Sequence, residues 1–261
     1  MSQKLKERIA SYQIATDYRL LPKVPLIITI NGRAFSKLTS LLGKPYDSTF
    51  AECMFSTTLS LANSVEGCLF AYQYNDEIVL VTRNDQHIDT APLYDNKIQK
   101  IVSTVSSLAT LHFNECSLSV NLNLLSTPIF TAQVFAVPNI SEAINTIVYK
   151  QQHNFLTSIQ FSCFYELLNK SFDKSAIKDM LSGLTVDEKI DLLKQECNVD
   201  FNNYPQTFRR GAACYKIPKV TDGIMKNKWA LNSDLPIFTK DQSFLSNIFK
   251  NGADIFREDN L

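Results

Sequence analysis

The sequence predicts an α+β fold in which an antiparallel sheet carries helices on one face. Three observations support this fold class: short runs of β-branched and aromatic residues, longer segments with apolar residues at helical spacing, and their order along the chain. That order is strand, helix, hairpin, helix, strand. Beyond Pro138 the chain becomes mostly helical. We therefore expect a core in residues 1–138, with a helical and hairpin region in residues 139–261 packed on it.

The first strand is expected at residues 24–31, VPLIITIN, because this short apolar run is rich in branched side chains and stops at Gly32. The next segment, which ends near residue 65, repeats apolar residues at helical spacing. Asp47 or Ser48 can cap its first turn. This pattern predicts a helix that packs on the sheet.

A β-hairpin is expected at residues 69–82, LFAYQYNDEIVLVT, because two strand-like runs meet at the turn-forming pair Asn75-Asp76. This places the carboxylates of Asp76 and Glu77 at the hairpin tip. An apolar stripe predicts a second helix over about 95–112, and strand-like runs follow at 116–124 and 129–137.

The C-terminal region reads as a long helix over about 141–168 and a shorter helix that ends at Gly183. The T-x-x-E sequence from Thr185 to Glu188 is a capping box, which predicts a further helix through about residue 196. The runs AACYKI and MKNKWAL, separated by a turn at 221–223, predict one more hairpin.

Composition limits the possible partners and compartments. Lys+Arg and Asp+Glu both number 26, so the chain has no global basic field and any RNA contact must be local. No apolar run approaches the roughly 20 residues that span a bilayer, and no signal-type segment follows the N-terminus, so we expect a cytoplasmic protein without membrane contact. Six cysteines without C-x-x-C spacing predict buried, reduced thiols.

The acidic hairpin tip is the first feature that points to chemistry. Palm-type polymerases and cyclases hold divalent metals on carboxylates at a strand end and on a neighbouring hairpin, because triphosphate chemistry needs charge neutralised on the reacting oxygens. Asp76 and Glu77 stand at such a place, although a surface Asp-Glu turn is an alternative for this pair alone. The sequence contains neither a Walker nor a Rossmann glycine motif, and its three histidines show no ligand or nucleophile spacing.

Several spaced segments, in order, resemble the tRNA-His guanylyltransferase family, enzymes that add nucleotides to RNA in the 3′-to-5′ direction. The similarity extends over roughly residues 18–217. The matching segments are YRLLP (18–22), NGRAF (31–35), GKPYD (43–47), FAYQYNDE (70–77), KIVSTVSSLAT, LSGLTVDEK (181–189) and FRRGAACYK (208–216).

The resemblance implies roles for particular residues. The metal positions of the family fall on Asn31, Gly32 and Asp76, with two Mg²⁺ ions expected, and Glu77 is the accompanying acidic residue. Asn31, Asp76 and Glu77 would form the catalytic set. The nucleotide pocket would take ATP, GTP or other NTPs, and tRNA would be the RNA partner. The implied nucleotide-binding residues are Gly32, Arg33, Phe35, Lys44 and Asn75; the implied RNA-binding residues are Arg209, Arg210 and Lys216.

Three neutral residues depart from the family pattern. Asn31 replaces a carboxylate, which should weaken metal binding. Thr131 and Gln133 stand where the family is similar to F-D-x-R-V. The family's H-I-N-N-L-Y-N signature for tRNA-His selection is replaced by QHNFLTSIQFS, which favours the branch that repairs tRNA 5′ ends.

Two functional hypotheses follow. The first is a template-dependent 3′-to-5′ nucleotidyltransferase that activates and extends tRNA 5′ ends, for repair or for tRNA-His guanylylation. The second is a catalytically weakened or inactive family member that binds tRNA or NTP as a subunit or regulator. A palm-fold nucleotide cyclase leaves the LSG and FRRG motifs without a role. Because family members are generally homotetramers, the resemblance also implies a homo-oligomer, either a dimer or a tetramer.

Overall fold

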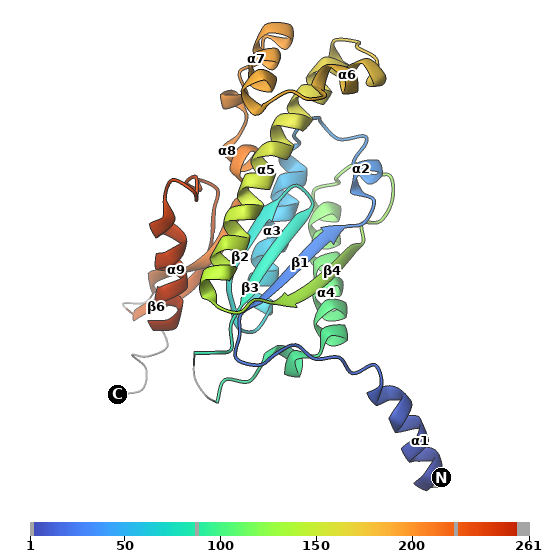
Figure 1. Cartoon of the computed structure of the whole chain (residues 1–261), viewed down its shortest axis with the longest axis vertical. Helices are drawn as coiled ribbons and strands as arrows, with labels where there is room; N and C mark the ends of the chain where they lie inside the picture. Colours follow the sequence, from blue (N-terminus) through green and yellow to red (C-terminus); the bar gives the residue numbers. More distant parts are fainter. Residues whose placement is uncertain (1–2, 87–88, 222–223, 255–261) are drawn as a thin grey trace.

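A computed structural model describes residues 3–86, 89–221 and 224–254, and Figure 1 shows the arrangement of the elements. Its central feature is an antiparallel sheet of six strands in the order β4-β1-β3-β2-β5-β6. The strands are β1 Leu26–Gly32, β2 Cys68–Tyr74, β3 Glu77–Thr82, β4 Phe130–Ala136, β5 Ala212–Thr221 and β6 Ile224–Asn232. The C-terminal region thus adds two strands to the sheet begun by the first 138 residues.

Helices cover this sheet and extend beyond it. They are α1 Gln3–Ile14, α2 Phe35–Leu38, α3 Ser48–Ser64, α4 Ile98–Ser119, α5 Ile140–Asn169, α6 Lys174–Leu181, α7 Val186–Cys197, α8 Gln206–Arg210 and α9 Gln242–Asp254, with short 3₁₀ turns at Leu93–Asn96 and Phe201–Asn203. α1 stands away from the body in Figure 1 and buries none of its described side chains. Among the described helices, none combines the length and apolar character that crossing a bilayer requires.

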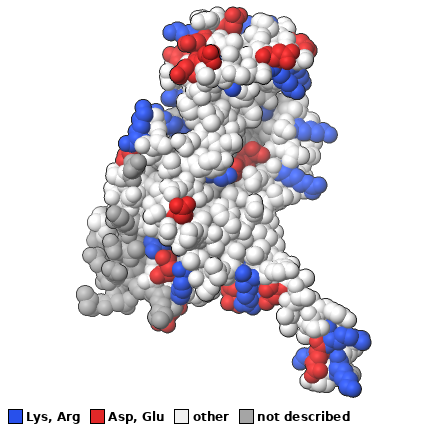
Figure 2. Space-filling model, in the orientation of Figure 1, with Lys and Arg blue, Asp and Glu red and all other residues white. Residues whose placement is uncertain are grey.

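Charged side chains are unevenly spread over the face shown in Figure 2. They gather at the end of the molecule formed by α6 and α7 and on α1, whereas most of the central surface is uncharged. Acidic and basic residues are equal in number in the sequence, so neither sign of charge dominates the molecule as a whole.

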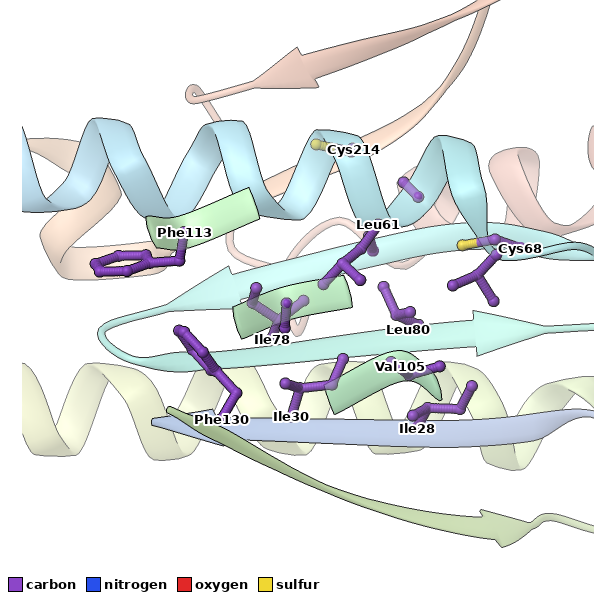
Figure 3. Close-up of a cluster of buried hydrophobic side chains, with 14 of the residues drawn as sticks. Ile28, Ile30, Leu61, Cys68, Ile78, Leu80, Val105, Phe113, Phe130 and Cys214 are labelled. Carbon is purple, nitrogen blue, oxygen red and sulfur yellow. The ribbon is translucent and has the colours of Figure 1, made fainter. Parts of the chain in front are cut away.

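One face of the sheet packs on α3 and α4. Figure 3 shows Ile28 and Ile30 of β1 with Leu61 of α3 and Val105 and Phe113 of α4, all of them fully buried. Successive strand residues point to opposite faces, so the even-numbered residues of β1 enter this cluster. Within the first 138 residues the two long helices therefore lie on one face, as the sequence predicts.

The opposite face is covered by helices from the C-terminal region. Ile27 of β1 and Tyr72 of β2 pack with Ala143 and Ile147 of α5 and with Phe249 of α9. The second half of α5 continues past the sheet and forms a third cluster with α6 and α7, as Figure 1 shows. This extension places the far end of α5 beside the tips of β1 and of the β2–β3 hairpin.

Most predicted elements are confirmed, including both helix caps. The Asp47 side chain accepts a hydrogen bond from Phe50 N at 2.9 Å, and Thr185 and Glu188 form the reciprocal capping box. The strand predicted at 116–124 is wrong. Helical hydrogen bonding in α4 continues to Ser119, and the following segment is an irregular turn in which Leu122 and Leu124 pack half-buried against the core. The C-terminal hairpin is confirmed, although positions 222–223 of its turn lie outside the described residues.

Candidate functional site

The tip of β1 and the tip of the β2–β3 hairpin lie side by side. Asn31 and Glu77 are directly opposed partners in the β1–β3 ladder, and Gly32 N donates a hydrogen bond to the Asp76 carbonyl at 3.0 Å. The hairpin turns at Asn75, whose φ is 47°, and Gln73 Nε2 holds this turn by donating to the Asn75 carbonyl at 2.7 Å. The predicted convergence of residues 31–32 with residues 76–77 is therefore confirmed.

A cavity of about 330 Å³ opens beside these two tips. Its walls come from α2 and the loop after it, the start of α3, the hairpin tip, the distal half of α5, and α8. Five of the predicted site residues line it: Gly32, Phe35, Lys44, Asn75 and Asp76. Its size suits a nucleotide-sized ligand, since ligand pockets commonly enclose a few hundred cubic ångströms.

Asp76 and Lys44 are the oppositely charged groups at this cavity. Asp76 is partly buried, and this burial raises the pKa of its carboxyl to about 6, although the positive charge of Lys44 opposes the shift. Burial also lowers the pKa of Lys44, whose Nζ donates to Thr39 Oγ1 at 3.1 Å and lies 5.8 Å from the Tyr165 ring centroid. A partly buried carboxylate together with a lysine at the same cavity is suited to binding a metal–phosphate group.

Glu77 points away from this cavity, toward α5. Its carboxylate forms an ion pair with Lys150 of α5. Asn31 lies on the same face of the sheet and lines a separate shallow hollow together with Thr29, Gln133 and Lys150. The three residues of the predicted catalytic set are therefore adjacent, but Asp76 lines the cavity, Asn31 lines the hollow on the face toward α5, and Glu77 pairs with Lys150 beside that hollow.

The structure separates Arg33 from the nucleotide cavity. Ala34 has φ 56° and ψ 32°, and this left-handed turn sends the side chains of Arg33 and Phe35 in different directions. Phe35 lines the cavity, whereas Arg33 lines a different hollow together with Lys37 and Leu125. Arg33 therefore does not line the cavity that Phe35 lines, and its contact with a nucleotide stays a prediction.

The predicted RNA-binding residues lie near the cavity without lining it. Arg209 Nε donates to the Tyr204 carbonyl at 2.9 Å, and Arg210 Nη1 donates to the Leu235 carbonyl at 3.2 Å. Both arginines belong to α8. The two residues before them on this helix, Thr207 and Phe208, form part of the cavity wall. Lys216 is farther along the exposed part of β5, where its Nζ lies 5.6 Å from the ring centroid of Trp229.

Sequence reasoning missed the aromatic wall and the partner of Glu77. Phe161 and Tyr165 of α5 line the cavity opposite the hairpin tip. Their spacing of four residues on one helix face was the available signal, and Phe161 is 38% exposed although it is a large apolar side chain. Nothing local in the sequence indicated that Lys150 would reach Glu77, 73 positions away.

Comparisons with known proteins point to one family. The model described as tRNAHis guanylyltransferase matches residues 6–138. tRNA(His) guanylyltransferase 1 of Arabidopsis thaliana is 24% identical over 226 residues, covering 84% of this chain and 38% of that protein. The tRNA(His) guanylyltransferase of Neurospora crassa is 22% identical over 204 residues, covering 76% of this chain and 68% of that protein.

A solved structure shows the same fold. It is a bacterial tRNA(His) guanylyltransferase-like protein in complex with ATP, with a TM-score of 0.81 and 24% identity, covering 94% of this chain and 98% of that one. The chain spans only 38% and 40% of the length of the two Arabidopsis relatives.

Proposed function

We propose, from the premise that this chain belongs to the tRNA(His) guanylyltransferase family, that it is a template-dependent 3′-to-5′ nucleotidyltransferase acting on tRNA 5′ ends. The observation that carries this proposal is the meeting of the β1 tip with the acidic hairpin tip at the wall of a nucleotide-sized cavity. ATP and GTP, which two similar bacterial structures contain, are the nucleotides proposed for this cavity.

In the proposed reaction, ATP or GTP first activates a 5′-monophosphorylated tRNA. This step joins AMP or GMP to the 5′ phosphate and releases pyrophosphate. The 3′-hydroxyl of an incoming NTP then attacks the activated 5′ phosphate, and the AMP or GMP leaves. Phosphoryl transfer requires chiefly alignment of the reacting oxygens and neutralisation of developing charge, so no protein nucleophile is needed. Phe161 and Tyr165 would cover the bound nucleotide on the α5 side, and Lys44 would pair with phosphate oxygens.

Magnesium fits the donor atoms at this site. The Asp76 carboxylate and the Gly32 carbonyl would offer the hard oxygen ligands that Mg²⁺ prefers, while the neutral amide of Asn31 lines the neighbouring hollow. No cluster of three metal-binding side chains occurs among the described residues, so substrate phosphates must complete the coordination. A bound ion supplies positive charge to the phosphate oxygens. The family resemblance implies two such ions.

We favour tRNA repair over selection of tRNA-His. In the stretch that replaces the family signature, Asn154 and Ser158 are fully buried, and Asn154 Nδ2 donates to Tyr72 OH at 2.9 Å. Side chains committed to packing α5 on the sheet are not free to read an RNA base. This supports acceptance of more than one tRNA.

The alternative of an inactive member is not favoured. Asn31, Thr131 and Gln133 remain its motivation, yet the cavity and the partly buried Asp76 are retained.

We also propose that Arg209, Arg210 and Lys216 contact RNA phosphates, that the protein acts in the cytoplasm, and that it assembles at least as a dimer. Exposed apolar residues such as Leu111 and Leu118 offer contact surface for a second copy of the chain. Light scattering measures the oligomeric state and so tests the proposed dimer.

The test of the proposed function is extension of a 5′-truncated, 5′-monophosphorylated tRNA with Mg²⁺ and labelled NTPs. Template-directed addition that stops at the full-length end is expected. The Asp76→Asn variant serves as the matched negative control because it keeps the shape of the side chain and removes its charge. Absence of extension by the native chain and by an Asn31→Asp variant alike would refute the proposal.

A further inference from the structure

We propose that Lys150 acts as a built-in cation at the end of β1, beside the nucleotide cavity, and that the chain consequently holds one divalent ion instead of two. The inference rests on the proposed function, since it concerns how the same site neutralises phosphate charge. It assigns a positioning role to a residue of α5, outside every motif that the sequence analysis singled out.

The ion pair between Lys150 and Glu77 is the first observation. The two side chains are 22% and 24% exposed, so water screens this pair less than it screens a pair on the open surface. Glu77 is the residue directly opposite Asn31 in the ladder. The ammonium group is thus held at the end of β1, where the family resemblance places a metal-binding carboxylate.

The loss of charge around Asn31 is the second observation. Thr131 opposes Asn31 on β4, and Gln133 lies two residues farther along the same exposed face. The family pattern carries acidic or basic residues at all three positions, and here all three are neutral. The acidic residue that lines this hollow is Glu142, which accepts a hydrogen bond from Asn145 and lies about two helical turns from Lys150.

The charge balance follows from these contacts. Lys150 compensates Glu77, which leaves Asp76 as the carboxylate of the hairpin tip without a salt bridge among the described residues. One magnesium–nucleotide complex fits this single carboxylate. A second divalent ion near Glu77 would have to displace or approach an ammonium group of like charge, which repels it. Asn31 and Lys150 therefore act together, because a carboxylate at position 31 would restore the charge that a second ion needs.

Counting Mn²⁺ ions tests the inference without relying on turnover. The protein is saturated with a non-hydrolysable ATP analogue, Mn²⁺ is added, and free Mn²⁺ is measured by electron paramagnetic resonance against a titration of the nucleotide alone. One Mn²⁺ per native chain is expected. Two ions of similar affinity in the native chain would overturn the inference, and this result needs no variant to fold.

Variants add the causal test. The pair of substitutions Asn31→Asp and Lys150→Met should create a second Mn²⁺ site at least about tenfold tighter than any second site of the native chain. Lys150→Arg should keep one ion, as should Lys170→Met, which removes an exposed lysine at the C-terminal end of the same helix. A correctly folded double variant that still binds one ion would contradict the role of Lys150. Failure of the proposed function would look different, since the native chain would then not extend the truncated tRNA, whatever number of Mn²⁺ ions it binds.

Discussion

Replacing Gly32 by alanine should damage both the fold and the nucleotide cavity. A Cβ atom at this position would lie 2.3 Å from Cδ2 of Phe35, far inside any van der Waals contact. Phe35 cannot easily move, because it is 3% exposed and its ring is held by other aromatic rings. The centroid distances are 5.0 Å to Phe130, 5.6 Å to Phe113 and 6.1 Å to Phe50.

The expected magnitude is that of overpacking a core, about 1–3 kcal/mol of the free energy of unfolding. Urea denaturation measures this loss, and binding of a fluorescent ATP analogue measures the effect on the cavity, which Gly32 and Phe35 both line. Gly183→Ala is the matched control. Its Cβ meets no atom within 4 Å, but its φ of 76° makes the substitution cost about 1–2 kcal/mol of backbone strain far from the cavity.

A double-mutant cycle separates the steric explanation from others. Phe35→Leu alone should cost about 1 kcal/mol, but in the Gly32→Ala background it makes room for the new methyl group. The two effects should therefore be less than additive by at least about 1 kcal/mol. Additive losses, or a Gly32→Ala variant with unchanged stability and nucleotide binding, would refute the reasoning.

Three further predictions concern charge, capping and thiols. Burial raises the pKa of Asp76 from 3.8 in the unfolded chain to about 6 in the folded state, so stability is lost as pH rises between these two values. Asp76→Asn should therefore raise the urea midpoint at pH 8 in EDTA, with little change at pH 3, and should cut tRNA extension by about 10²–10³. An equal shift at both pH values would contradict the burial explanation. Thr185→Ala should cost about 1 kcal/mol in urea denaturation by removing the capping box with Glu188, and an unchanged midpoint would argue against it. Burial raises the pKa of Cys68 and of Cys214 to about 12, so iodoacetamide at pH 8 should leave both thiols unmodified in the native protein. Mass spectrometry measures the labelling, and rapid modification of either thiol would contradict the packing.

The elements that sequence alone predicted well are those determined by neighbouring residues. The β2–β3 hairpin follows from two strand-like runs around Asn75, and the start of α7 follows from its capping box. α9 was not predicted, because its packing on the sheet depends on contacts such as that between Phe70 and Phe249, which lie far apart in the sequence. The run at 116–124 was misread because exposed apolar residues at a helix end resemble an alternating strand.

The candidate site shows the same division between local and distant information. The contact of Gly32 with Asp76 was predictable, because the strand end and the hairpin tip each carry a local signal. The orientation of Arg33 was not, because it depends on the left-handed conformation of Ala34, an alanine that carries no preference for that turn. The pairing of Lys150 with Glu77 depends on how α5 crosses the sheet, which no local pattern encodes.

The most direct measurement is a crystal structure of the protein with Mn²⁺ and a non-hydrolysable ATP analogue, with the ion located by its anomalous scattering. The account predicts an ion at coordination distance, roughly 2.0–2.2 Å, from the Asp76 carboxylate, with the triphosphate in the cavity beside Gly32 and Lys44. An ion and nucleotide bound elsewhere on the chain, with the two tips unoccupied, would contradict it.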